Sequence, residues 1–389
     1  MQEPFDLYSN AIDRDPFPGY ALLREQHPCY WSEKAGIWIL TRYEDVFMAA
    51  QDWQRFSSLR GNLVDEIPGR SGGTLGTTDP PRHDRLRALA QAAFARKNLD
   101  DVVQPASDTA GRALEKIVSR PHFDFVSDFS SVVTVETIFR LLGLDQPDPA
   151  ETRAEVVLSI STDKERRGRN PKLDAAFKRL TTYISQEVEK RRAKPADDLI
   201  TKLAEAEIDG DKLSEREVVL TTSMFVVAGV ESLSSFMSIF ALNLAQFHDS
   251  RRRLVKDHDL IPQAIEESLR YNTSAQRFKR TLNEDLELHG CTMRKGDPVI
   301  LAYGAANRDE RQFTNADMYD IDRNPRGHLG FGSGKHFCIG SAFARLVAQT
   351  AMNRFLEQVP EFELASPEFD WVPSSNFRSP VTLPLAIRR

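Results

Sequence analysis

A single long apolar helix constrains the fold of this chain more than any other feature of its sequence. A helical pattern runs from Ser214 to about Phe247, and Ser214 and Glu217 form a capping box at its start. The run is apolar enough to suggest a membrane span, but Glu217, Glu231 and several Ser and Thr residues favour a buried core helix instead. The sequence therefore predicts a long helix in the interior of the protein.

The remaining patterns predict an α+β fold that is predominantly α-helical, with a small β-rich region. Short strands are expected at 29–32, 36–40, 286–288, 298–302 and 381–387. Further helices are expected at 16–26, 42–51, 81–94, 100–119, 128–143, 149–160, 171–193, 197–206, 260–271 and 338–356.

Length and composition indicate an ordinary globule. The chain has 389 residues and no linker, repeat or low-complexity tract that would divide it, so residues 1–389 are expected to form one domain. The net charge of −6 argues against general nucleic-acid affinity. Three cysteines cannot form a disulfide scaffold, and the N-terminus has neither a basic region nor an apolar stretch. We expect a cytoplasmic monomer without a membrane anchor.

One cysteine stands on a glycine-punctuated turn at 331–340, just before a helical segment. At a helix N-terminus the dipole and the free backbone N–H groups favour the thiolate form of Cys338. A thiolate could be a nucleophile, a redox thiol or a metal ligand, and the alternative is a small, inert, buried cysteine. Gly332, Gly334 and Gly340 argue against the inert alternative, because glycines let backbone pass close to a flat group or adopt positive φ.

The pattern Phe-x-x-Gly-x-His-x-Cys-x-Gly, filled by Phe331, Gly334, His336, Cys338 and Gly340, resembles the haem-binding loop of the cytochrome P-450 family. The resemblance implies the fold of that family, with a long central helix over haem b. It also implies that Cys338 is the proximal thiolate ligand of the haem iron, a donor that favours O–O bond cleavage.

The two haem propionates need cationic partners. His83 and Arg87 are four residues apart, so they share one helical face; taken alone they would be a solvated basic helix. They resemble the propionate-binding His-x-x-x-Arg of the family, and Arg280 and His336 are the further donors that the resemblance implies. Other haem contacts are expected from Ala228, Phe331, Gly332 and Gly340.

Glu267 and Arg270 form a helical i,i+3 acid–base pair, a spacing that also arises often by chance. About 70 residues before the cysteine, it resembles the structural Glu-x-x-Arg pair of the family. A third cation, Arg323, is expected to complete a buried network.

The middle of the long helix is expected to handle dioxygen and protons. Glycine inside a helix costs roughly 1 kcal/mol relative to alanine, so Ala228-Gly229 suggests the close approach of something flat or a local kink. Beside it, Glu231 and Ser232 could form a proton relay. The segment resembles the Ala-Gly-x-Asp/Glu-Thr signature of the family, so Gly229, Glu231 and Ser232 are the predicted catalytic residues; the alternative is two ordinary helix residues. Ser232 departs from the usual Thr: it keeps the hydroxyl but lacks the methyl that holds the rotamer.

The substrate pocket is expected to be apolar and to take an apolar or aromatic small molecule. Gln276 could orient a polar group, and Arg277 and Arg378 could clamp a carboxylate or form exposed salt bridges. The connections 61–76 and 162–170 are candidates for substrate access and lid motion. The expected pocket residues are Met224, Val227, Ala228, Ala275, Gln276, Phe278 and Phe377.

The resemblance implies a monooxygenase that hydroxylates or oxidatively O-demethylates its substrate. The sequence carries no flavin- or nicotinamide-binding segment, so electrons from NAD(P)H should arrive through ferredoxin reductase and ferredoxin. Alternatives are a peroxide-driven or non-oxygenating haem enzyme, and a non-catalytic haem-binding sensor. An acidic donor could be attracted by a basic patch, although scattered solvated cations are an equal possibility. The patch would comprise Arg82, Arg85, Arg96, Lys97, Lys335 and Arg345.

Overall fold

The long apolar segment forms one continuous helical rod through the protein. A computed structural model describes residues 4–93, 96–145 and 148–388. The rod consists of α10 (Glu215–Val227), the π-helical turn η3 (Ala228–Ser232) and α11 (Leu233–Gln246). The predicted capping box is present, with the Glu217 backbone N–H donating to Ser214 Oγ at 3.3 Å.

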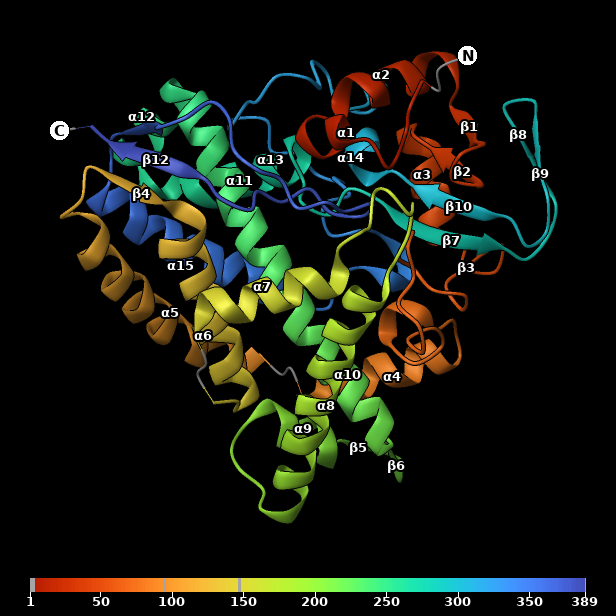
Figure 1. The fold of residues 1–389 in the computed structure, drawn as a ribbon, viewed down its shortest axis with the longest axis horizontal. Helices are drawn as coiled ribbons and strands as arrows, with labels where there is room; N and C mark the ends of the chain where they lie inside the picture. Colours follow the sequence, from red (N-terminus) through yellow and green to blue (C-terminus); the bar gives the residue numbers. More distant parts are fainter. Residues whose placement is uncertain (1–3, 94–95, 146–147, 389) are drawn as a thin grey trace.

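The rod is a core helix, as predicted. By length and composition alone, Glu215–Gln246 could cross a membrane, with a mean hydropathy of 1.8. However, 78% of that apolar window is buried inside the protein, and every residue of α11 from Leu233 to Ala245 is buried. Figure 1 shows the rod crossing the middle of the molecule between the other helices.

The surrounding helices begin and end largely where local signals predict. Asp148 caps α7 by accepting from the Glu151 backbone N–H at 2.9 Å, and Gly143 ends α6 with φ of 75°. The short 3₁₀ turns are η1 (Leu75–Thr77), η4 (His258–Leu260) and η5 (Gly334–His336). A second π-helical turn, η2 (Val126–Ser130), leads into α6. The other helices are α1 (Asn10–Arg14), α2 (Phe17–Gln26), α3 (Tyr43–Gln51), α4 (Arg82–Ala93), α5 (Arg96–Ile117), α6 (Ser131–Leu142), α7 (Pro149–Ile160), α8 (Pro171–Ala193), α9 (Leu199–Glu205), α12 (His248–Lys256), α13 (Ile261–Tyr271), α14 (Tyr303–Ala306) and α15 (Ser341–Gln358).

Two larger sheets lie at opposite ends of the molecule in Figure 1. The first has the order β1 (Cys29–Ser32), β2 (Ile37–Leu40), β10 (Pro298–Leu301), β7 (Phe278–Leu282) and β3 (Phe56–Ser57). Its β2–β10 pair is parallel, with Trp38 opposite Val299, and its other pairs are antiparallel. The second has the order β11 (Phe362–Leu364), β12 (Pro384–Ile387) and β4 (His122–Asp124). Two hairpins complete the β structure, β5 (Glu207–Ile208) with β6 (Asp211–Lys212), and β8 (Leu286–Leu288) with β9 (Cys291–Met293).

The sequence did not predict the short helices α1 and α14, helix α12, or the strands β3, β4, β5, β6, β7, β9 and β11. The β7 segment, Phe-Lys-Arg-Thr-Leu, has little apolar alternation, and it is a strand because β10 and β3 pair with its two edges. Helix α12 buries only Arg251 and Leu254, so its sequence shows too narrow an apolar stripe to predict a helix.

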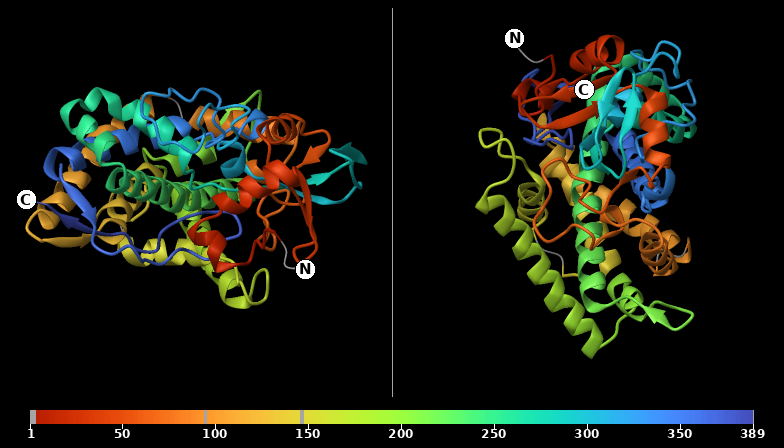
Figure 2. Two further views of the ribbon diagram at one scale, coloured as in Figure 1. Left: turned by 90° about the horizontal axis from the view of Figure 1, so that it is seen from above. Right: turned by 90° about the vertical axis from the view of Figure 1, so that its right-hand side faces the viewer.

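The packing brings three parts of the chain to one place near the middle of the rod. Helix α15, which follows the cysteine turn, packs against α5 and α13, and α6 packs against η3. Turned views show the rod enclosed by helices on several sides (Figure 2). This arrangement sets the cysteine turn, α4 and η3 around a common space.

Candidate active site

An internal cavity of about 330 Å³ collects most of the predicted site residues. Its wall is formed by the rod, α4, β7, the loop at 61–76 and the cysteine turn. The predicted residues that line it are His83, Arg87, Met224, Val227, Ala228, Gly229, Ser232, Ala275, Phe278, Arg280, Phe331, Gly332, His336, Cys338, Gly340 and Phe377.

The cysteine turn is held by its own backbone. The Cys338 backbone N–H donates to the Phe331 carbonyl at 2.9 Å, and Gly332 and Gly334 have φ of 69° and 66°. A Cβ at Gly334 would lie 2.4 Å from the Ala50 carbonyl oxygen of α3, so that glycine is required by packing as well as by φ. The turn therefore fixes the sulfur relative to both α3 and α15.

The environment of the sulfur differs from the sequence prediction. Burial raises the pKa of the Cys338 thiol, and this outweighs the opposing effects of the Gly340 backbone N–H, Arg87 and Arg345. The helix N-terminus alone therefore does not make the thiolate the favoured form of Cys338. A metal cation on the sulfur would supply the positive charge that a thiolate needs in this position.

Two guanidinium groups make the cavity electropositive. Arg87 Nη1 donates to the Phe337 carbonyl at 2.9 Å, and Arg280 Nη1 donates to the Lys279 carbonyl at 2.8 Å. Among the described residues that line the cavity there is no Asp or Glu. Arg87 and Arg280 therefore face the space without an acidic partner in its wall, which suits a ligand that carries carboxylates.

The two histidines point to the same kind of ligand. His83 is fully buried; its Nδ1 lies 3.1 Å from Asp84 Oδ1, and its Nε2 has no hydrogen-bond partner. Burial lowers the pKa of both rings, that of His336 to about 2, and the Ser58 hydroxyl lies 3.1 Å from His336 Nε2. A carboxylate beside His83 Nε2 would satisfy this orphaned atom and favour the protonated ring, since both nitrogens would then face acids.

The opposite wall of the cavity is the π-helical turn η3. A Cβ at Gly229 would lie 2.7 Å from Ile138 Cγ1, so α6 approaches the rod too closely for any other residue. The sequence offered a local kink or the close approach of something flat; the structure shows a π-helical turn here, and the approach of a flat group stays a prediction. The close approach that the structure shows at Gly229 is that of a neighbouring helix.

Ser232 and Glu231 point in different directions. Ser232 lines the cavity, whereas the fully buried Glu231 does not. Arg153 Nε on α7 lies 3.1 Å from Glu231 Oε2, and Ser235 Oγ donates to Glu231 Oε1 at 2.9 Å. The sequence placed Glu231 behind Ser232 in a proton relay, and that relay stays a prediction. Arg153 was missed because 78 residues separate it from Glu231, whereas Ser235, four residues on, was within reach of helical spacing.

Three predicted polar pocket residues also face away from the cavity. Gln276 packs against Gly304 and donates to the Thr273 carbonyl. Arg378 donates to Asn272 Oδ1 at 2.8 Å and lies over the Trp371 ring at 3.8 Å, and Arg277 is buried outside the cavity wall. The predicted polar orientation by Gln276 and the carboxylate clamp are therefore corrected, because none of the three residues lines the cavity. The alternative of exposed salt bridges is also wrong, since Arg277 and Arg378 are buried.

Glu267 and Arg270 form a fully buried, two-bond ion pair, with distances of 2.8 and 2.7 Å. Arg323 Nε lies 3.2 Å from Glu267 Oε1, which completes the network with the third cation that the sequence suggested. The pair lies on α13, which packs against α15 behind the cysteine turn.

The cations expected to form a basic patch are largely paired with acids. Arg82 and Arg85 contact Glu217, at 3.3 and 3.1 Å, Lys335 contacts Asp84 at 2.9 Å and Arg345 contacts Glu266 at 2.6 Å. The side chains of Arg96 and Lys97 lie outside the described residues. The patch is thus a set of ion pairs in its described part, because the fold brings acids from other elements to each cation.

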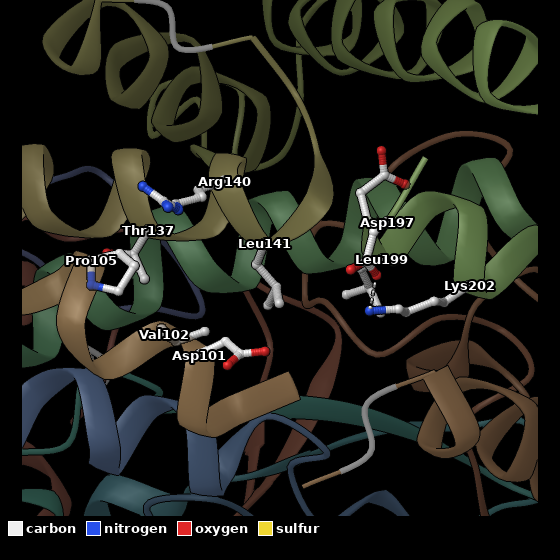
Figure 3. Close-up of a pocket in the computed structure, with 10 residues that line it drawn as sticks. Asp101, Val102, Pro105, Thr137, Arg140, Leu141, Asp197, Leu199 and Lys202 are labelled. Atoms are coloured by element: carbon white, nitrogen blue, oxygen red, sulfur yellow. Dashed lines mark ion pairs between the residues drawn. The ribbon is translucent and has the colours of Figure 1, made fainter. Parts of the chain in front are cut away.

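A smaller hollow of about 130 Å³ lies between α5, α6 and α9, away from the cysteine (Figure 3). Lys202 and Asp197 form an ion pair of 2.9 Å in its wall. Its lining shares no residue with the larger cavity.

Comparisons with known proteins agree on one family. The family model described as Cytochrome P-450 matches residues 153–384. The Putative cytochrome P-450 123 of Mycobacterium tuberculosis is 30% identical over 388 residues, which are 98% of this chain and 96% of the relative. The Mycinamicin IV hydroxylase/epoxidase of Micromonospora griseorubida is 33% identical over 355 residues, which are 90% and 89% of the two chains. Among solved structures, the bacillaene polyketide synthase cytochrome P-450 PksS of Bacillus subtilis superimposes with a TM-score of 0.91, at 28% identity, over 99% of this chain and all of that one.

Proposed function

This chain belongs to the cytochrome P-450 family of haem monooxygenases, and we propose that it hydroxylates or oxidatively O-demethylates an apolar or aromatic small molecule. The observation that carries the proposal is the composition of one cavity wall. It holds a single cysteine, the guanidinium groups of Arg87 and Arg280 and otherwise mainly apolar side chains, with no acid among its described residues. That combination suits a flat, dianionic metal cofactor with an apolar substrate above it.

The family uses haem b, and the residues present fit it. Cys338 would bind the iron, and Arg87, Arg280, His83 and His336 would hold the two carboxylates. The orphaned His83 Nε2 is the clearest sign of such a group. When bound, the haem supplies the iron at which dioxygen is activated. Contacts with the ring faces and edges are assigned to Ala228, Phe331, Gly332 and Gly340.

Ser232 is our candidate for moving protons at the active centre. Ser232 lines the cavity as the last residue of the π-helical turn, where its Oγ would hold a water and move a proton within the cavity. Glu231 directly precedes Ser232 in the chain, but its carboxylate contacts Arg153 and accepts a hydrogen bond from Ser235. We propose that Glu231 fixes the turn and orders Ser232, and that it joins a relay only when its contact with Arg153 loosens.

The substrate site is the apolar part of the cavity above the cysteine. Its side chains exclude water and offer few hydrogen bonds, so binding should follow shape and apolar area. The residues that we assign to it are Met224, Val227, Ala228, Ala275, Phe278 and Phe377.

Electrons should come from a ferredoxin, reduced by ferredoxin reductase at the expense of NAD(P)H. A surface hollow of about 280 Å³ lies beside the cysteine turn, and Phe47 and Phe337, each about two-fifths exposed, flank it. Arg345 also lines this hollow, and Lys335 lies in the chain between Ser333 and Phe337, two of the residues that line it. We assign donor docking to this surface, and we propose a cytoplasmic monomer with no nucleic-acid partner.

Spectroscopy and turnover test the proposal together. The reduced protein treated with carbon monoxide should show the strongly red-shifted Soret band that a trans thiolate produces. Purified protein with a surrogate ferredoxin system should then oxidise an apolar compound that shifts the Soret band on binding. A normal spectrum without turnover by any donor would favour a haem-binding sensor, and turnover with peroxide alone would favour the peroxide-driven alternative.

A further inference from the structure

The loop at 61–76 packs at the cavity wall against the two helices that the connection at 162–170 joins. Leu63 and Ile67 of the loop pack in one buried apolar cluster with Ile160, Phe177 and Phe377. All five of these side chains also line the cavity. Part of the cavity wall therefore depends on how these separate segments are held together.

Asp65, midway between Leu63 and Ile67 in the loop, forms hydrogen bonds with three other segments of the chain. Its Oδ1 accepts a hydrogen bond from the Tyr8 hydroxyl at 3.0 Å. Its Oδ2 accepts hydrogen bonds from Thr162 Oγ1 at 2.8 Å and from Ser375 Oγ at 2.7 Å. One half-buried carboxylate thus receives donors from the N-terminal segment, the connection after α7 and the C-terminal segment.

The donors are themselves fixed. Thr162 and Ser375 are buried; the Thr162 backbone N–H donates to the Pro373 carbonyl at 2.8 Å, and the Ser375 backbone N–H donates to Thr162 Oγ1 at 3.1 Å. On its other side the loop is anchored by the Val64 backbone N–H, which donates to Asn376 Oδ1 at 3.1 Å. The carboxylate is therefore the point where the loop and the connection are joined.

The connection has its own ties to the N-terminal segment. Lys164 Nζ lies 2.8 Å from Asp13 Oδ1, and Arg167 lies 3.1 Å from Asp6 and over the Tyr8 ring. These ion pairs hold 162–170 without the loop. Loss of the Asp65 contacts would consequently remove the hydrogen bond that ties the loop to the connection, while the loop keeps its hydrogen bonds to Asn376 and to the Lys279 backbone N–H and the connection stays in place.

We propose that Asp65 is a positioning residue for substrate binding: it fastens Leu63 and Ile67 into the cavity wall and slows the escape of a bound molecule. The inference rests on the proposed function, because it requires this cavity to be the substrate site. Hydrogen bonds to an ionised carboxylate are about twice as strong as neutral ones. Three hydroxyl donors on one carboxylate therefore hold the loop firmly against its neighbours. Loss of the carboxylate removes three hydrogen bonds at once, although the Thr162 and Ser375 hydroxyls keep their contact with each other at 3.1 Å. Loss of one donor removes one hydrogen bond to Asp65 and leaves two.

The test uses the haem-loaded full chain and two probes of different size. Phenylimidazole binds the iron and fills the cavity, whereas cyanide binds the iron and needs little space. Dissociation of each is followed by the Soret band after rapid displacement. Asp65→Ala should accelerate phenylimidazole release about tenfold, the size expected for losing strong hydrogen bonds that close the wall. Cyanide release and the unfolding midpoint should stay close to wild type.

Single-donor variants keep the test valid if Asp65→Ala fails to fold. Thr162→Val and Ser375→Ala each remove one hydroxyl with almost no change of shape, and each should accelerate phenylimidazole release by a smaller factor. Asp65→Asn, which keeps an acceptor oxygen but loses the charge, should fall between wild type and Asp65→Ala. The matched control is Asp285→Ala. Asp285 is an exposed acid that forms an ion pair with Arg294 next to the β8–β9 hairpin, and its loss should change neither release rate.

Two results would overturn the inference. One is unchanged phenylimidazole release in folded, haem-loaded Asp65→Ala. The other is equal acceleration of both probes together with a lower unfolding midpoint, which would mean a purely structural role. A wild-type protein without the thiolate-type spectrum would instead refute the proposed function, so the two failures are distinguishable.

Discussion

Removing the Glu267 carboxylate should be among the most damaging single changes in this protein. Glu267 accepts hydrogen bonds from Arg270 Nε and Nη2, from Arg323 Nε and from the Asp320 backbone N–H. All of these lie within 2.7–3.2 Å, and both Glu267 and Arg270 have no exposed surface. In Glu267→Ala the Arg270 charge stays buried, with only the carbonyl groups of Asn307, Ala316 and Met318 as acceptors.

The expected cost follows from that burial. Removing one member of a buried, hydrogen-bonded ion pair costs about 3–5 kcal/mol, since the other charge is left uncompensated. Typical domains have a free energy of unfolding of about 5–15 kcal/mol. If each kcal/mol lowers the midpoint by about 2 °C in a chain of this size, the thermal midpoint should fall by roughly 6–10 °C. Little soluble, haem-loaded protein is expected from expression at the usual temperature.

An exposed ion pair that also has two hydrogen bonds of similar length provides the control. Arg253 and Asp322 also form two bonds, at 2.7 and 2.8 Å, but their side chains are 47% and 58% exposed. Asp322→Ala should cost less than about 1 kcal/mol. Expression yield, the ratio of Soret to protein absorbance and thermal unfolding by circular dichroism measure both variants. Equal losses in the two, or wild-type yield and haem content in Glu267→Ala, would refute the reasoning.

Three further changes test the site. Cys338→Ser should abolish the strongly red-shifted band of the reduced carbon-monoxide complex, and its survival would remove Cys338 as the iron ligand. Ser232→Ala should lower the product formed per NAD(P)H consumed while haem binding stays intact; unchanged coupling would exclude Ser232 from proton transfer. Lower pH should destabilise the haem-free protein, because burial, aided by the nearby Arg280 and His83 side chains, holds the pKa of His336 at about 2 when folded. An unfolded histidine titrates near 6.5, so the unfolded state binds more protons below that pH and the unfolding free energy falls by up to about 1.4 kcal/mol per pH unit. Urea titrations at neutral and mildly acidic pH should show a shallower dependence in His336→Gln, and identical slopes would contradict the assignment.

Local signals predicted many of the helices. The capping box at Ser214, Asp148 before Pro149, and Gly143 each act within a few residues, so their effect can be read along the chain. Strand β7 could not be read this way, because its backbone is extended through pairing with β10, beyond the β8–β9 hairpin, and with β3, which lies far away in sequence.

The direction of polar side chains was the main failure of sequence reasoning. Adjacent residues on an α-helix point about 100° apart. Ser232 and Glu231 could therefore both face one cavity only if the cavity lay in the direction midway between their two side chains. Which of the two residues faces the cavity depends on where α6 and α7 pack against the turn, and Arg153 on α7 forms an ion pair with the Glu231 carboxylate. Likewise, acids from distant elements turned the expected basic patch into ion pairs.

By itself, the sequence determined the chemistry available to this protein: one cysteine on a glycine turn, cations at helical spacing on α4, and a long apolar helix with a glycine and a hydroxyl at its centre. These features depend on residue type and on spacings of a few residues, because the backbone geometry of a helix or turn places residues at such spacings next to each other. Only the tertiary structure decided which of those groups face the cavity, which are neutralised, and how Asp65 joins segments far apart in the chain. Such contacts are set by the packing of whole elements against each other, and no local rule of sequence contains that information.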